Sequence, residues 1–151
     1  AVKLEGGSKI INIIKHLIKN NIPVQGHLGL LPQSQKGKFR YKGKKLAEGN
    51  KILKDAKLLE TAGVFSIVLE CIENSLAKKI TDSIKILTIG IGASPHCDGQ
   101  VLVTDDLIGL NQIKVRFVKK YIDIRKYINN AIKKFKKEFK EKKFPNKKYI
   151  Y

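Results

Sequence analysis

Residues 64–71 read Val64-Phe65-Ser66-Ile67-Val68-Leu69-Glu70-Cys71, a run that is apolar at almost every position. A strand with one solvated face alternates apolar and polar residues, whereas a strand covered on both faces is apolar nearly throughout. The run therefore predicts a buried strand of a parallel sheet, with Glu70 close to its carboxyl end. A carboxylate is costly to bury there without a partner or a role. We expect Glu70 either to form a structural ion pair, for example with Lys3, or to take part in chemistry.

The same strand-and-helix unit recurs along the chain on both sides of this run. Each expected strand ends in glycine or polar residues, and a segment with apolar residues at helical spacing follows it. Ser8 and Asn74 are the expected N-caps of two of these helices. Residues 100–110 receive no assignment. The expected strands end near Glu5, Gly29, Cys71 and Gly92, and the expected helices run from Ser8 to Asn20, Leu46 to Ala62, Asn74 to Ile84 and Lys114 to Lys143.

Strands that alternate with helices predict an α/β fold with a parallel sheet. An open doubly wound sheet and part of a (β/α)8 barrel both fit the pattern. The doubly wound fold usually carries a glycine-rich phosphate-binding turn, but Gly90-Ile91-Gly92 is followed by Pro95 where a third glycine belongs. A whole barrel takes about 250 residues. We therefore expect residues 1–151 to form one partial barrel domain, about half a barrel with a C-terminal helix, that starts inside a strand at Ala1.

Composition excludes several classes of protein. A hydrophobic content of 42% argues against wholesale disorder, and no apolar run reaches the roughly 18 residues of a membrane span. Two cysteines, Cys71 and Cys97, form no disulfide framework, which favours a reducing compartment. Residues 114–151 hold 15 basic and 3 acidic side chains, two thirds of the net charge of +18. Only three of the 31 basic residues are arginines, so we interpret this charge as solvated surface rather than a nucleic-acid site.

Chemically useful side chains gather at the carboxyl ends of the expected strands. Lys3 and Glu5 stand two residues apart, so they share one face of their strand. His27 and Glu70 end the next two strands. The carboxyl ends of parallel strands form one rim, and that rim is where active sites of α/β proteins lie. The fourth strand adds Gly90 and Gly92 and, beyond them, Ser94, His96 and Asp98.

Five motifs in this order resemble the ketopantoate hydroxymethyltransferase family. The resemblance covers residues 1 to about 145, with a small deletion near Gln35–Lys38. The motifs are Val2-Lys3-Leu4-Glu5-Gly6-Gly7; Gly26-His27-Leu28-Gly29-Leu30 with Pro32-Gln33-Ser34; Tyr41-Lys42-Gly43-Lys44; Val68-Leu69-Glu70-Cys71; and Gly90-Ile91-Gly92-Ala93 with Cys97-Asp98-Gly99-Gln100-Val101-Leu102-Val103.

The resemblance implies a (β/α)8 barrel in a cytoplasmic, magnesium-dependent, decameric enzyme. The implied reaction transfers a hydroxymethyl group from 5,10-methylenetetrahydrofolate to 3-methyl-2-oxobutanoate, giving 2-dehydropantoate for pantothenate and coenzyme A synthesis. By motif position, Lys3 resembles the lysine that binds the keto acid, and Glu5 resembles the glutamate of the magnesium site. Glu70 resembles the proton acceptor, and His27 resembles an active-site histidine that we assign to substrate binding. Asp98-Gly99 reads as a structural turn.

The resemblance also has departures. The family's two aspartate ligands of magnesium lie on strands that precede the segment matched here. Ile72-Glu73 stand where a proline often follows the Glu-Cys pair, and Gly37-Lys38 replace a pair of glycines. An inactive remnant of the enzyme and a basic nucleic-acid-associated protein stay as alternatives. A lyase of the phosphoenolpyruvate mutase kind shares this general chemistry, but the motifs at His27 and Asp98 argue against it.

Overall fold

The computed structural model describes residues 1–33, 40–112 and 114–151. Ser34 of the second motif, the deletion near Gln35–Lys38 and the Gly37-Lys38 departure lie outside the described residues. The chain divides into two units, Ala1–Val101 and Leu102–Tyr151. The first unit contains the sheet and all of the predicted site residues, and each unit is described by itself below.

A sheet of five parallel strands is the centre of the first unit. The strands are β1 (Val2–Glu5), β2 (Val24–Gly29), β3 (Ser66–Glu70), β4 (Leu87–Ile91) and β5 (Gly99–Gln100). They lie in the order β1-β2-β3-β4-β5, and every neighbouring pair is parallel. The predicted α/β class is confirmed. Sequential order is that of consecutive barrel strands, whereas a doubly wound sheet reverses its order at a switch point.

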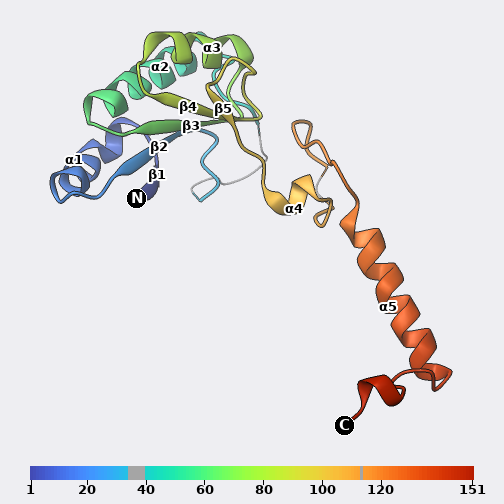
Figure 1. The fold of residues 1–151 in the computed structure, drawn as a ribbon. Coiled ribbons are helices and arrows are strands. Elements are labelled where there is room, and N and C mark those ends of the chain that lie inside the picture. Colours follow the sequence, from blue (N-terminus) through green and yellow to red (C-terminus); the bar gives the residue numbers. More distant parts are fainter. Residues whose placement is uncertain (34–39, 113) are drawn as a thin grey trace. The chain divides into compact units, whose positions relative to one another are not determined.

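Three α-helices connect these strands and pack on one face of the sheet (Figure 1). They are α1 (Ile11–Lys19), which the 3₁₀ turn η1 (Ser8–Ile10) precedes, α2 (Leu46–Thr61) and α3 (Asn74–Ser83). Side chains at every second strand position meet the apolar stripes of the helices, as the pleat of a strand requires. The buried cluster includes Val24, Leu28, Ile67 and Leu69 from the strands, and Ile14, Leu59 and Ile80 from the helices.

The helix ends show how local chemistry differs from the prediction. Both predicted N-caps are wrong by one residue. Gly7 precedes η1 without a side-chain cap. Glu73 precedes α3, where its carboxylate accepts hydrogen bonds from the hydroxyl of Ser75 and the backbone N–H of Leu76. These bonds favour the charged form and lower the pKa of Glu73. The predicted end of α2 is confirmed, because Gly63 takes a positive φ and the carbonyls of Leu59 and Glu60 accept bonds as in a Schellman motif.

The second unit contains α4 (Thr104–Leu107), α5 (Ile124–Lys140) and a final 3₁₀ turn, η2 (Lys147–Tyr149). The prediction of a helix from Lys114 is wrong over its first ten positions. The N–H groups of Tyr121 and Ile124 bond the carbonyls of Leu107 and Ile108, so this segment folds back on α4 instead of continuing α5. Among the residues described, no helix has the length and apolar character needed to cross a bilayer.

Candidate functional site

The face of the sheet opposite the helices carries the predicted site residues. Strand register places Glu5 beside His27, and His27 beside Val68. Glu70 lies two residues beyond Val68 on β3, so it points to the same face. Lys3 also shares this face, one pair of residues nearer the amino ends of the strands. The predicted gathering of Lys3, Glu5, His27 and Glu70 on one face is therefore observed.

His27 lies between two carboxylates. Its Nε2 atom is 3.2 Å from Oε2 of Glu70, and its Nδ1 atom is 3.7 Å from Oε1 of Glu5. The histidine is fully buried, while the side chains of Glu5 and Glu70 are 9% and 14% exposed. Within the described part of the chain, neither ring nitrogen is aligned for a hydrogen bond. The imidazole thus lies at ion-pair distance from both carboxylates, whose side chains are largely buried.

The segment after β2 fixes both carboxylate-bearing strands. The N–H of Leu30 donates to the carbonyl of Glu70 at 2.8 Å, and the N–H of Gln33 donates to Oε2 of Glu5 at 3.2 Å. Gly29 has a φ of +99°, and a Cβ atom there would lie 2.1 Å from the Glu70 carbonyl oxygen. Only glycine allows this approach, so the glycine that ends β2 lets the chain come close to the carboxyl end of β3.

Lys3 is exposed and lies on β1, two residues before Glu5. The ion pair of Lys3 with Glu70, which the sequence left open as a structural explanation, is not observed among the described residues, where the imidazole of His27 lies beside Glu70 instead. An exposed ammonium on the same face as the two carboxylates is available to an anionic ligand.

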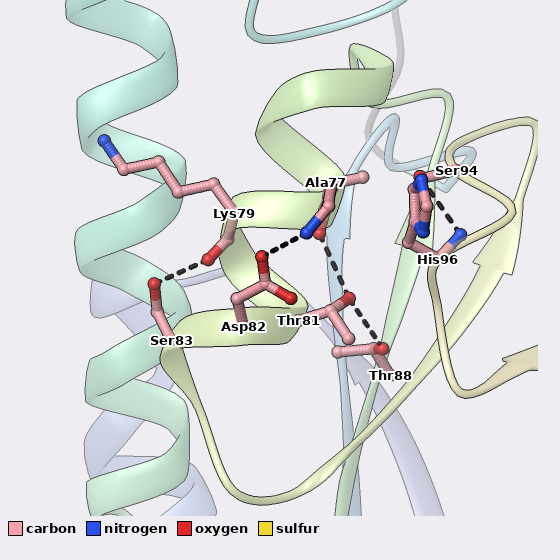
Figure 2. A network of polar contacts seen from close by, with 9 residues as sticks. Ala77, Lys79, Thr81, Asp82, Ser83, Thr88, Ser94 and His96 are labelled. Atoms are coloured by element: carbon pink, nitrogen blue, oxygen red, sulfur yellow. Dashed lines mark hydrogen bonds and ion pairs between the residues drawn. The ribbon is translucent and has the colours of Figure 1, made fainter.

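Two neighbouring groups have structural roles. Burial, followed by the adjacent Glu70 carboxylate, raises the pKa of the Cys71 thiol to about 11, so the sulfur stays protonated near neutral pH and is a poor nucleophile. The carboxylate of Asp98 accepts bonds from the N–H and the hydroxyl of Thr88, and these bonds lower its pKa. Figure 2 shows Thr88 bonded in turn to Thr81 of α3. Asp98 thus ties the loop after β4 to the sheet, which agrees with the structural role expected of it.

Sequence reasoning missed Asp55. Its carboxylate, on α2, is buried and accepts a hydrogen bond from the N–H of Ser8, directly after the turn that follows Glu5. A signal was present in the sequence, because Asp55 stands three residues after Ile52 and four before Leu59, both on the buried stripe of the helix. A charged residue inside such a stripe indicates a buried polar partner.

Magnesium is implied by the resemblance, and the donor set can be tested against it. No group of three or more histidine, cysteine, aspartate or glutamate residues that could hold a metal is present in residues 1–33, 40–112 and 114–151. Magnesium is usually held by one or two carboxylates, with water and substrate oxygens completing its shell. Glu5 is a carboxylate of the kind such a site uses and would be one ligand, whereas the described residues alone would not complete a magnesium site.

These observations define a class: a parallel α/β protein of barrel-like strand order with acid–base residues at the carboxyl ends of its strands. A family model described as ketopantoate hydroxymethyltransferase matches residues 1–147, and the chain belongs to that family. The predicted family is therefore confirmed, and the sheet is consistent with part of the family's predicted (β/α)8 barrel.

Curated relatives that match nearly the whole chain share one name. A 3-methyl-2-oxobutanoate hydroxymethyltransferase from Pelagibacter ubique is 68% identical over 151 residues, which are all of this chain and 58% of the relative. The enzyme of that name from Sulfurisphaera tokodaii is 50% identical over 99% of this chain and 57% of its own length. One from Thermoanaerobacter is 47% identical over the whole chain and 56% of its length. The chain therefore spans just over half the length of the relatives it matches.

Proposed function

We propose that the protein transfers a hydroxymethyl group from 5,10-methylenetetrahydrofolate to 3-methyl-2-oxobutanoate, giving 2-dehydropantoate on the route to pantothenate and coenzyme A. The observation that carries the proposal is the position of His27 between Glu5 and Glu70 on the open face of the sheet. Relatives named for this reaction support it. A basic nucleic-acid-binding role has less support, because the acid–base residues lie together and the basic residues concentrate beyond residue 113.

The chemistry needs a base, and Glu70 is the group best placed to supply it. In the proposed reaction the Glu70 carboxylate takes the C3 proton of the keto acid, and the electron pair left behind forms an enolate. His27, whose Nε2 atom lies 3.2 Å from the Glu70 carboxylate, would bind the substrate beside this base. Lys3 would pair with the substrate carboxylate and the developing negative charge.

The second half of the reaction is a carbon–carbon bond formation. The enolate carbon attacks the one-carbon unit, whose bonds to the two folate nitrogens break, and water supplies the hydroxyl group. The nitrogens gain the proton removed from C3 and the remaining proton of water, so the atoms balance. Glu5 would hold magnesium, which when bound polarises the keto oxygen as a Lewis acid. The decameric assembly and the cytoplasmic location stay predictions.

Deuterium exchange at C3 of 3-methyl-2-oxobutanoate tests the proposal by proton NMR in deuterated buffer with magnesium. In Glu70→Gln we expect the exchange rate to fall by about 10²–10⁴-fold, the usual worth of a general base. Asp82→Asn is the control, because Asp82 is an exposed carboxylate of α3 that pairs with Lys78.

The two failures can be told apart. Exchange that is unchanged in Glu70→Gln would contradict the role of Glu70 as the base. No exchange in the unsubstituted protein, with magnesium and keto acid present, would contradict the proposed activity of this chain and support the inactive remnant. Calorimetric titration with magnesium and keto acid then shows whether the site still binds them.

A further inference from the structure

Asp55 is a buried carboxylate that the proposed reaction does not use. It lies on α2, and its side chain is 7% exposed. Oδ1 accepts the N–H of Ser8 at 3.1 Å, and Oδ2 accepts a charge-assisted bond from Nζ of Lys51 at 2.8 Å. Ser8 and Asp55 are 47 residues apart in the chain. The contact is therefore a tertiary tie between a helix and the turn after β1, and it replaces the local N-cap that η1 lacks.

Two glycines, Gly6 and Gly7, connect Ser8, which Asp55 holds, to Glu5 at the end of β1. The Asp55 carboxylate lies so close to Gly7 that a Cβ atom there would come within 2.2 Å of Oδ2. The preceding residue, Gly6, has a φ of +130° and donates its N–H to the carbonyl of His27 at 3.1 Å. Glycines restrict the backbone least of all residues, so a Gly-Gly turn has no fixed shape of its own and needs outside contacts to hold one.

We propose that Asp55 is a positioning residue that sets the distance between Glu5 and His27 by fixing the turn at Gly6–Gly7. On one side of this turn the N–H of Ser8 is held by Asp55, and on the other side Glu5 faces His27 in register. The kinetic part of this inference rests on the proposed function, whereas the structural part does not.

The same helix offers a matched control. Glu60 of α2 also accepts a backbone N–H from a distant loop, that of Lys85. Lys85 precedes β4, so this tie lies at the amino ends of the strands, whereas the tie at Ser8 lies at their carboxyl ends. Loss of either carboxylate removes a hydrogen bond from α2 to a loop, but only the loss of Asp55 should change the surroundings of the His27 imidazole.

The experiment follows His27 by NMR in protein labelled at the imidazole carbons. The chain contains three histidines, and His96, in the loop after β4, serves as an internal reference. In Asp55→Ala we expect the His27 signal to move and that of His96 to stay. In Glu60→Ala we expect a lower melting temperature without a move of the His27 signal. Asp55→Asn keeps an oxygen for the Ser8 N–H, so it should restore the wild-type position of the signal.

An unmoved His27 signal in folded Asp55→Ala would overturn the proposal, and so would a shift of equal size in Asp55→Asn. Should the alanine variant not fold, Asp55→Leu keeps the branched shape of the side chain, in a larger volume, while removing the acceptor, and the same two outcomes apply to it. C3 exchange gives the second readout, with an expected fall of up to about 10²-fold in Asp55→Ala, because a displacement near 1 Å can cost that much. The NMR measurement needs no turnover, so it decides about Asp55 even where the proposed activity fails.

Discussion

The two faces of the central strands differ in what they bury. The face covered by the helices presents Val24, Leu28, Ile67 and Leu69, which join the apolar core. The alternate positions of the same strands place Gln25, His27, Ser66 and Glu70 on the other face. Since the two sets alternate along one backbone, a single sequence encodes a packing surface and a chemical surface at once.

The polar face is also ordered by its own bonds. Nε2 of Gln25 donates to the hydroxyl of Ser66 at 2.8 Å, one register layer below His27. Ser66 is buried, and its oxygen nevertheless has a partner, as buried polar groups require. The helix face thus supplies stability, and the opposite face supplies fixed positions for charged groups.

The largest effect should come from a cavity on the helix face. Ile67 is fully buried in the core, so Ile67→Ala should lower the free energy of unfolding by about 2–5 kcal/mol. Lys3→Ala on the opposite face should cost about 0.5 kcal/mol or less, since Lys3 is exposed. Urea unfolding followed by circular dichroism measures both. Equal losses in the two variants would contradict the division of roles between the faces.

A smaller effect should follow from one substitution made on each face. Val24→Thr places a hydroxyl in the apolar cluster and should cost about 1–3 kcal/mol, the usual penalty of a buried polar group without a partner. Val68→Thr keeps the same shape change, but Val68 faces the side of the sheet that holds His27 and Ser66. There the hydroxyl can find a polar partner, and we expect a cost below about 1 kcal/mol. Urea unfolding followed by circular dichroism measures both variants. A larger loss of stability in Val68→Thr than in Val24→Thr would contradict the division of roles between the two faces.

The sequence predicted this division only in part. Apolar runs located the strands, and the two-residue spacing of Lys3 and Glu5 placed both on one face. Strand boundaries were predicted less closely, because β3 occupies only Ser66–Glu70 of the apolar run at 64–71. The tie of Asp55 to Ser8 depends on a partner 47 residues away, and the start of α5 depends on bonds to α4. Periodicity places Asp55 on the buried stripe of α2, but contacts between distant segments leave no local pattern, so the partner in each contact is not predicted.

Thr88 is an exception to this division, because it is a polar residue on the face covered by the helices. Register with Ile67 places it on the helix face, and it is fully buried. A polar group is tolerated there because its N–H and hydroxyl bond the carboxylate of Asp98, while Thr81 bonds the same hydroxyl. The bonds to Asp98 should therefore stabilise the fold more strongly while that carboxylate is ionised.

The smallest predicted effect is consequently one of pH. Bonds from the backbone N–H of Thr88 and then from its hydroxyl lower the pKa of Asp98 in the folded protein. A lowered pKa means that the stabilisation is fully present above the ordinary aspartate value of about 3.9 and is lost as pH falls through the folded-state value. Unfolding free energies measured by urea from neutral to acid pH should therefore fall less steeply at the acid end in Asp98→Asn than in the unsubstituted protein. Glu73→Gln tests the same linkage at a second place, because the pKa of Glu73 is also lowered at the cap of α3, so this variant should flatten the acid slope as well while the Thr88 bonds stay in place. Acid slopes that coincide for Asp98→Asn and the unsubstituted protein would show that Thr88 is accommodated on the helix face without the charge of Asp98.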